Sequence, residues 1–519
     1  MQSSESQEPS AISPADQGEA WIDRQLERLT PRQKLAQRLV VLPGVADDGR
    51  PDEDTRAALA AGLGVLHGLT GMSVSAAARY HVEVAGIADE LGLPPALVSA
   101  NLESGVGYTL GGGGTDFPYP RGIGHSDDAG LARRMAEEAA REARLAGFHW
   151  TFSPCVDVLT TPDDPILGVR AFGLEADRTA VLGVAQIRGY QDGGLLATAK
   201  HFPGHGDSAK DTHAEAAPLA RTPEDHEHRH LPPFRAAIEA GVASVMVAHV
   251  ALPGLGVPGP ASLSPVVNRT WLRTELGYDG LVVTDSLRMG AIVAGWPTAA
   301  SAVAALAAGA DVANVKCPAG EVPSILDALE AALAAGELDG DELDRSVARL
   351  LRAKVRLGLH RAHGIDLARC EELDAGRSWA DPGLAGTVSA RLPDPVRGPV
   401  VVVGDSELAR SLADGLKVAR GEVAYEALSS PGEAARAHAG ATVVAVTCPL
   451  PVDGGRDSAE FAASVEAARA HGHPVVAVVN STVPATGLRV AGPAVSVPAV
   501  DAFGIVSGAA VGAAVEVLG

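Results

Sequence analysis

The sequence of 519 residues is poor in aromatic side chains, which make up 4% of it, although 46% of the residues are hydrophobic. An all-β sandwich would normally place more aromatic residues in its core. The abundant Ala, Val and Leu instead favour helices packed on parallel strands. Cysteine is also scarce, and the four residues show no CxxC spacing: Cys155, Cys317, Cys370 and Cys448. We therefore expect reduced core cysteines, with neither a disulfide framework nor a zinc site, and no cofactor.

Basic residues are too few to balance the acidic ones, since 42 Lys and Arg face 64 Asp and Glu, a formal charge of -22. Such a surface repels nucleic acid and anionic lipid, so neither is an expected partner. Long apolar runs are missing as well, and residues 1–20 lack the basic and apolar regions of a secretory signal. We interpret 1–20 as a disordered polar tail and predict a cytoplasmic protein.

What the sequence does contain is a repeated alternation of short apolar runs and amphipathic segments. Eight such runs occur before about residue 315, and helical patterns such as 128–145 and 232–240 lie between most of them. Eight β/α units predict a (β/α)8 barrel, which we place at residues 21–361. The eight runs are 38–42, 64–67, 95–99, 150–154, 195–199, 244–248, 281–284 and 310–314.

A second unit follows the predicted barrel. Residues 362–397 are rich in Gly, Pro and Asp and are interpreted as a linker. Apolar runs resume at 400–404, 442–446 and 475–479, with Ala-rich segments between them. This pattern predicts a smaller open α/β domain over 398–519.

Polar side chains follow the apolar runs of the predicted barrel where its strands should end. The carboxyl ends of barrel strands meet at one face, which carries the active site of such barrels. Convergence of several polar ends at that face predicts a pocket for a polyhydroxylated or charged ligand. The residues concerned are Asn101, Glu103, Asp157, Lys200, His201, His249 and Asp285.

The densest polar segment runs from Lys200 to His213. Asp211 and His213, two residues apart, could supply an imidazole and the carboxylate that sets its tautomer and basicity. Glycines at 204 and 206 predict that the loop over 204–213 is mobile and closes over a substrate.

Two motifs in this segment, KHFPGHG at 200–206 and DTH at 211–213, resemble glycoside hydrolase family 3, in its bacterial β-N-acetylglucosaminidase branch. The resemblance implies a retaining, exo-acting β-N-acetylhexosaminidase that releases non-reducing β-N-acetylglucosamine from small glycans or peptidoglycan fragments. It implies Asp285 as nucleophile and His213 as general acid/base oriented by Asp211. The implied sugar-binding residues are Lys200, His201 and Arg170, and the strand ends add Asn101, His249 and Asp157 as candidates.

Several alternatives stay open on the sequence alone. Asn101 stands where the family usually has Asp, which puts the exact sugar in doubt and leaves β-glucosidase activity or a feebly active sugar-binding protein as alternatives. A neutral imidazole does not repel phosphate, so a phosphorylase is another alternative. Asp285 could instead cap a helix, Lys200 could form an ion pair with Asp157, and His249 could merely pack under the loop.

Overall fold

The computed structural model describes residues 14–110, 114–115, 117, 119–126, 128–160, 167–208, 218–361 and 364–375, and the backbone of six strands between 389 and 497. Eight parallel strands before residue 319 form two sheets, ordered β4-β3-β2-β1-β8 and β5-β6-β7. Parallel bridges between Trp150 and Leu196 and between Val283 and Val312 join the two sheets at both seams. The strands therefore close into the predicted barrel. They are β1 (Leu39–Leu42), β2 (Val65–His67), β3 (Leu97–Ala100), β4 (Trp150–Thr151), β5 (Thr198–Phe202), β6 (Ser244–Val247), β7 (Leu281–Thr284) and β8 (Ala313–Pro318).

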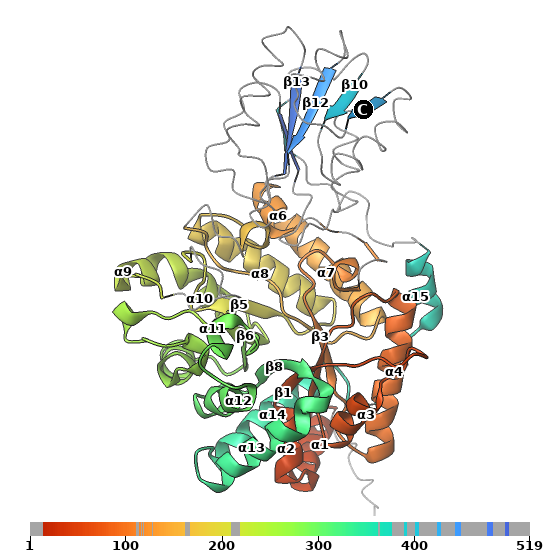
Figure 1. Cartoon of the computed structure of the whole chain (residues 1–519), viewed down its shortest axis with the longest axis vertical. Coiled ribbons are helices and arrows are strands. Elements are labelled where there is room, and N and C mark those ends of the chain that lie inside the picture. The colour runs from red at the N-terminus through yellow and green to blue at the C-terminus, as the bar shows by residue number, and fades with distance from the viewer. Residues whose placement is uncertain are drawn as a thin grey trace, which may run out of the picture.

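Helices surround this barrel (Figure 1). Their apolar faces pack on the strands, as in α14, where Leu343, Val347 and Leu351 are buried and Asp339 caps the helix by accepting from the Glu342 N–H. The helices are α1 (Pro14–Arg28), α2 (Pro31–Gln37), α3 (Glu53–Ala60), α4 (Val74–Leu91), α5 (Val106–Leu110), α6 (Pro120–Ser126), α7 (Ala129–Leu145), α8 (Ala176–Asp192), α9 (Pro223–Asp225), α10 (Pro232–Glu239), α11 (Gly290–Val293), α12 (Thr298–Ala307), α13 (Val322–Ala334), α14 (Gly340–Arg356) and α15 (Leu367–Asp374). Among the described residues, no helix has both the length and the hydropathy to cross a bilayer.

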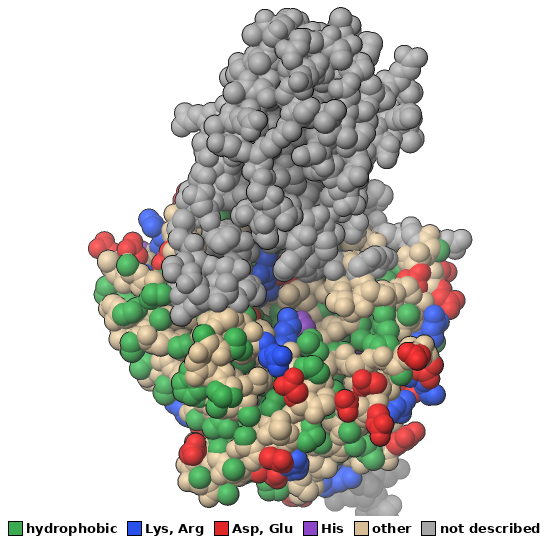
Figure 2. Space-filling model, in the orientation of Figure 1, with side chains coloured by type: hydrophobic (Ala, Val, Ile, Leu, Met, Phe, Trp, Pro, Cys, Tyr) green, Lys and Arg blue, Asp and Glu red, His purple; other side chains and the backbone are tan. Residues whose placement is uncertain are grey.

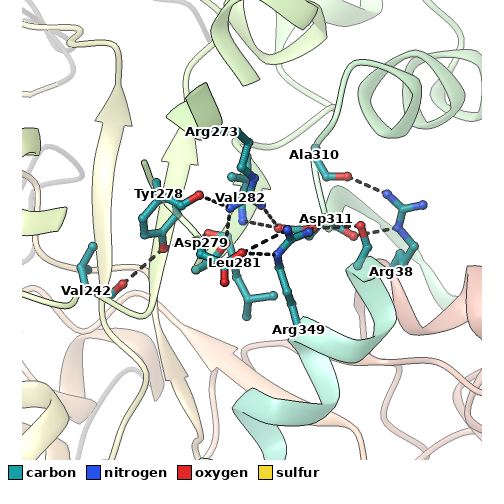
Figure 3. A network of polar contacts seen from close by, with 12 residues as sticks. Arg38, Val242, Arg273, Tyr278, Asp279, Leu281, Val282, Ala310, Asp311 and Arg349 are labelled. Carbon is teal, nitrogen blue, oxygen red and sulfur yellow. Dashed lines mark hydrogen bonds and ion pairs between the residues drawn. The ribbon is translucent and has the colours of Figure 1, made fainter. Parts of the chain in front are cut away.

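The buried residue Asp311 links β7, β8 and β1 near the amino-terminal ends of these strands (Figure 3). Asp311 accepts from Arg273, at 2.5 Å, and from the Val282 N–H, at 2.8 Å. Its other oxygen accepts from Arg349, at 3.2 Å, while Arg38 donates to the Asp311 main-chain oxygen, at 2.9 Å. These charge-assisted contacts fix the end of the barrel opposite the predicted site.

Two strands are displaced along the chain from their predicted positions. β5 begins at Thr198 and runs to Phe202, so Lys200 and His201 lie within a buried strand and not in a loop. β8 begins at Ala313 and continues to Pro318, four residues beyond the predicted end. In both cases polar side chains extend the strand into the mouth of the barrel, where hydropathy alone suggests that the strand has ended.

The predicted boundaries need two corrections. Helix α1 begins at Pro14, so the tail predicted over 1–20 is too long. The predicted linker contains helix α15, whose Asp374 accepts from the N–H groups of Val74, at 2.7 Å, and Ser75, at 3.0 Å. Both donors lie at the start of α4, so α15 is anchored to the barrel by a carboxylate at a helix amino terminus.

Beyond the barrel, a second sheet has the order β11-β10-β12-β13-β14-β9. Its central strands agree with the three predicted apolar runs, and all pairs are parallel except β14 with β9. Strand β9 comes from the predicted linker. The bounds are β9 (Ser389–Arg391), β10 (Val400–Val403), β11 (Val423–Glu426), β12 (Thr442–Thr447), β13 (Val475–Asn480) and β14 (Ala494–Val497). The helices expected between these strands lie outside the described residues.

Candidate active site

Two of the predicted sugar-binding cations share one carboxylate at the carboxyl end of the barrel. Glu103 Oε1 accepts from Lys200 Nζ at 2.7 Å and from Arg170 Nη2 at 2.9 Å. Burial alone would raise the pKa of Glu103, but the charges of Lys200 and Arg170 outweigh it and lower the pKa to about 2. The alternative that Lys200 pairs with Asp157 is therefore wrong, because Glu103 is its partner.

His201 is held by Asp157 in a defined tautomer. Asp157 Oδ2 accepts from His201 Nδ1 at 2.7 Å and from the His201 main-chain N–H at 3.0 Å. Burial lowers the pKa of His201, although Asp157 opposes the shift. The ring is therefore neutral near pH 7, with the proton on Nδ1 and an acceptor lone pair on Nε2.

Asp157 itself is fully buried. Besides His201 it accepts from the His205 N–H, at 2.8 Å, and from the Cys155 thiol, at 3.2 Å. Both oxygens of Asp157 accept hydrogen bonds from the protein, so the expected contact between Asp157 and substrate is corrected to a structural role. It positions the strand end and the beginning of the following loop.

Cys155, Asp157 and His201 also place three potential metal-ligand atoms within 4.8 Å of one another. In this arrangement both the thiol and the imidazole donate protons to the carboxylate. Burial raises the pKa of the Cys155 thiol well above its usual range, so a thiolate ligand would be unfavourable there. The three residues fit a hydrogen-bonded cluster better than a cation site. Cys155, Cys317 and Cys370 are buried and free, and Cys448 lies outside the described residues.

The first part of the predicted mobile loop, residues 204–208, is tied to the barrel. Buried Arg221 donates to the main-chain oxygens of Pro203, at 2.8 Å, and Gly204, at 3.0 Å, and also pairs with Asp207. The Gly206 oxygen accepts from the Thr160 N–H at 2.7 Å. Asp211 and His213 lie outside the described residues, so their acid/base role stays a prediction.

The predicted nucleophile, Asp285, directly follows β7. Its N–H donates to the Val247 oxygen at 2.8 Å, and its Oδ1 accepts from the Ser286 N–H at 2.7 Å. The capping alternative is wrong, since the next helix, α11, begins at Gly290 with Met289 as its N-cap. The carboxylate of Asp285 is within electrostatic range of His201, His249 and Lys316.

His249 supports this turn and has no ring nitrogen left for a ligand. Its Nε2 donates to the Ser286 main-chain oxygen at 2.8 Å, and its Nδ1 lies 2.7 Å from Ser262 Oγ. Burial lowers its pKa, consistent with a neutral ring that accepts at Nδ1. Its predicted contact with substrate is therefore corrected to a positioning role beside Asp285.

Asn101 lies half-buried after β3, two residues before Glu103, and its main-chain oxygen accepts from Thr109 Oγ1 at 2.8 Å. Its role as a sugar ligand stays a prediction. The structure thus brings Arg170, Lys200, His201 and Asp285 to one end of the barrel. On the face seen in Figure 2, Lys or Arg side chains and a histidine gather near the centre of the barrel.

Three charged or titratable residues of this site have no role that the sequence predicts. Glu103 follows a predicted strand, but its two cationic partners come from other parts of the chain. His67, at the end of β2, is buried and stacks on Phe152. Burial, together with the charges of Lys316 and Lys200, lowers the pKa of His67. Lys316 lies beyond the predicted end of its strand, and only the continued β8 places it in the site.

Known families and proteins are similar to this chain in sequence and in fold. Residues 72–353 match the family described as "Glycosyl hydrolase family 3 N terminal domain". A Cellulomonas fimi protein named β-N-acetylglucosaminidase/β-glucosidase is 30% identical to this chain. The match covers 67% of this chain and 61% of that protein. The β-hexosaminidase LpqI of Mycobacterium tuberculosis is 35% identical over 63% of this chain and 83% of its own.

A solved structure of a family 3 β-N-acetylglucosaminidase from Paenibacillus sp. superposes with a TM-score of 0.79 at 27% identity, covering 94% of this chain and 96% of that one. These matches confirm the predicted fold class and the predicted enzyme class, a glycoside hydrolase related to β-N-acetylhexosaminidases. The chain belongs to glycoside hydrolase family 3, in the β-N-acetylglucosaminidase branch that its motifs resemble.

Proposed function

We propose that the protein is a retaining, exo-acting β-N-acetylglucosaminidase that works through a covalent intermediate on Asp285. The observation that carries this proposal is the position of Asp285 at the end of β7, held by Ser286 and by no helix cap. An ionised carboxylate at this point can stabilise an oxocarbenium ion and then bond to the anomeric carbon.

In the first half of the reaction, Asp285 attacks the anomeric carbon while His213 protonates the departing glycosidic oxygen. In the second half, His213 removes a proton from water, which attacks the same carbon and releases Asp285. Asp211 would accept from the His213 ring and stabilise its charged form. The support for this pair is the DTH motif that follows the anchored strand end at 200–206.

Sugar recognition would use groups that point from β5 and its neighbours into the mouth of the barrel. Lys200 donates one of its three N–H bonds to Glu103 and can offer the others to hydroxyl groups. His201 Nε2 can accept from a hydroxyl, because Asp157 fixes the ring proton on Nδ1. Arg170 and Asn101 would complete this set.

The names of the relatives support β-N-acetylglucosamine as the sugar, and small glycans or peptidoglycan fragments handled in the cytoplasm fit the same proposal. β-Glucosidase activity is a second candidate, because the Cellulomonas relative carries both names. The test compares an aryl β-N-acetylglucosaminide with the matching aryl β-glucoside. We expect faster turnover of the amino sugar, and turnover of the glucoside alone would refute the amino-sugar assignment.

His213→Ala tests the acid role in the same assay. Loss of the acid should slow substrates with poor leaving groups far more than those with good ones, because a good leaving group departs without protonation. An equal loss across leaving groups would contradict the role of His213.

A further inference from the structure

A hollow with a volume of about 210 Å³ lies at the amino-terminal end of the barrel, opposite the proposed active site. Leu196, Val242 and Leu281 line it from the beginnings of β5, β6 and β7, and helix α14 forms its other side. The three side chains are buried, so the floor of the hollow is apolar. Figure 3 shows Leu281 and Asp279 beside Arg349 of α14, where this helix meets the start of β7.

Helix α14 lines the hollow with three arginines, Arg349, Arg352 and Arg356. Their spacing of three and then four residues places them on one face of the helix. The macrodipole accounts for basic residues in the last turn of a helix, but Arg349 lies two turns before the end of α14. The chain as a whole carries a formal charge of -22. The helix therefore gathers positive charge over an apolar floor in an otherwise acidic protein.

Arg349 is held in place by carboxylates of the barrel. It donates to Asp279 Oδ1 from Nε at 3.2 Å and from Nη2 at 3.1 Å, and its Nη1 donates to Asp311 Oδ1 at 3.2 Å. Among the described residues that line the hollow, only Asp279 is acidic. Because Arg349 already engages this carboxylate, Asp279 opposes an incoming anion only weakly.

The other two guanidinium groups are available for a ligand. Arg352 forms one ion pair, a loose one with Glu19 at 3.7 Å. In the part of the chain that the structure describes, the Arg356 side chain makes no hydrogen bond or ion pair. Both arginines are exposed, and an exposed ion pair at such a distance contributes little. Two positive charges thus stand beside the hollow with little to balance them.

The chemistry of this arrangement fits a phosphate group. The planar fork of an arginine matches two phosphate oxygens, and Arg352 and Arg356, four residues apart on α14, can bind one group together. A phosphate monoester carries about two negative charges at neutral pH, which equals the charge of the two arginines. The organic part of such a molecule can cover the apolar floor.

We propose that this hollow binds a small phosphate monoester, with the phosphate on Arg352 and Arg356 and the organic part against Leu196 and Leu281. The site lies at the other end of the barrel from Asp285, and the inference does not depend on the proposed function.

The test measures the binding of phenyl phosphate and of inorganic phosphate by isothermal titration calorimetry, at about pH 7.5 and at constant ionic strength with NaCl as the balancing salt. Wild type is compared with Arg352→Gln, Arg356→Gln and Arg356→Lys. Arg345→Gln is the matched control, because it removes the same charge from an exposed position of the same helix that does not line the hollow. Circular dichroism verifies that each variant is folded.

We expect phenyl phosphate to bind wild type with a Kd below about 1 mM, and at least about 3-fold more tightly than inorganic phosphate, because its ring covers the apolar floor. Arg352→Gln and Arg356→Gln should each weaken binding at least about 5-fold. Arg356→Lys keeps the charge but not the fork, so its loss should be smaller than that of Arg356→Gln. Arg345→Gln should stay within about 2-fold of wild type.

Three results would overturn the inference. Wild type does not bind phenyl phosphate, or binding survives both Arg352→Gln and Arg356→Gln and so takes place elsewhere on the protein, or Arg345→Gln loses as much affinity as Arg356→Gln. The last result would show a diffuse attraction of anions to the helix. Equal affinity for phenyl phosphate and inorganic phosphate would contradict the role of the apolar floor and reduce the site to one for a bare anion.

Discussion

The ring of His201 and the carboxylate of Asp157 form a buried pair in which Nδ1 donates to Oδ2 over 2.7 Å. The same oxygen accepts from the His201 main-chain N–H over 3.0 Å. Asp157 therefore sets both the tautomer of the ring and the path of the strand. The ring can accept from a sugar hydroxyl only while this carboxylate holds the proton on Nδ1.

Asp157→Asn should weaken both effects. An amide keeps one acceptor oxygen but places an NH2 group against buried donors, so we expect the free energy of unfolding to fall by about 1–3 kcal/mol. KM should rise because His201 loses its fixed tautomer. Urea unfolding and steady-state kinetics measure the two effects. Asp177→Asn, an exposed site at the start of α8, is the control and should change stability by less than about 0.5 kcal/mol. Equal behaviour of the two variants would contradict this account.

Gly206 tests the close packing of the loop against the fourth strand end. A Cβ atom at this position would lie 1.9 Å from the Val158 main-chain oxygen. Gly206→Ala should therefore displace the loop, cost about 1–3 kcal/mol in unfolding free energy and lower kcat. At Gly259 an added Cβ meets nothing within 4 Å, so Gly259→Ala is the matched control. Full activity and stability of Gly206→Ala would show that the loop does not depend on this contact.

The barrel and its polar end could be predicted because hydrophobic runs and strand-end residues follow each other in the sequence. The pairing between strand ends could not. The sequence offers Asp157 as an ion-pair partner of Lys200, yet Lys200 bonds to Glu103, which follows β3 and is 97 residues away. Such a contact depends on the curvature of the closed barrel and has no local signal.

Lys316 shows a second limit of the sequence. The eighth apolar run ends at Asn314, whereas β8 continues through a bulge that hydropathy does not reveal. Similarly, no long apolar run marks β11 and β14, which are strands of four residues. They are recognised as strands only by their pairing with β10 and β13 in the second sheet.

Lys354, outside the active site, should make the free energy of unfolding depend on pH. It is fully buried, and its Nζ donates to Gln37 Oε1 at 2.6 Å. Burial lowers its pKa to about 7, from 10.5 in the unfolded chain. Between these pH values the unfolded chain binds a proton that the native protein lacks, so stability should rise with pH by up to about 1.4 kcal/mol per unit.

Lys354→Met should remove this dependence. We expect the variant to be more stable than wild type at pH 6 by about 1–4 kcal/mol, with a smaller advantage at pH 9. Urea unfolding at pH 6, 7, 8 and 9 measures the slope. Arg345→Met, an exposed change on the same helix, is the control. A variant less stable than wild type at pH 6, or an unchanged slope, would contradict a buried cation at Lys354.

Trapping of the sugar on the protein tests the proposed covalent bond to Asp285. The protein is incubated with a 2-deoxy-2-fluoro glycosyl probe carrying a good leaving group, digested, and the labelled peptide is sequenced by mass spectrometry. Asp285→Asn serves as the negative control. We expect one added glycosyl group, located on Asp285 in wild type and missing in Asp285→Asn. A label on any other residue would contradict it.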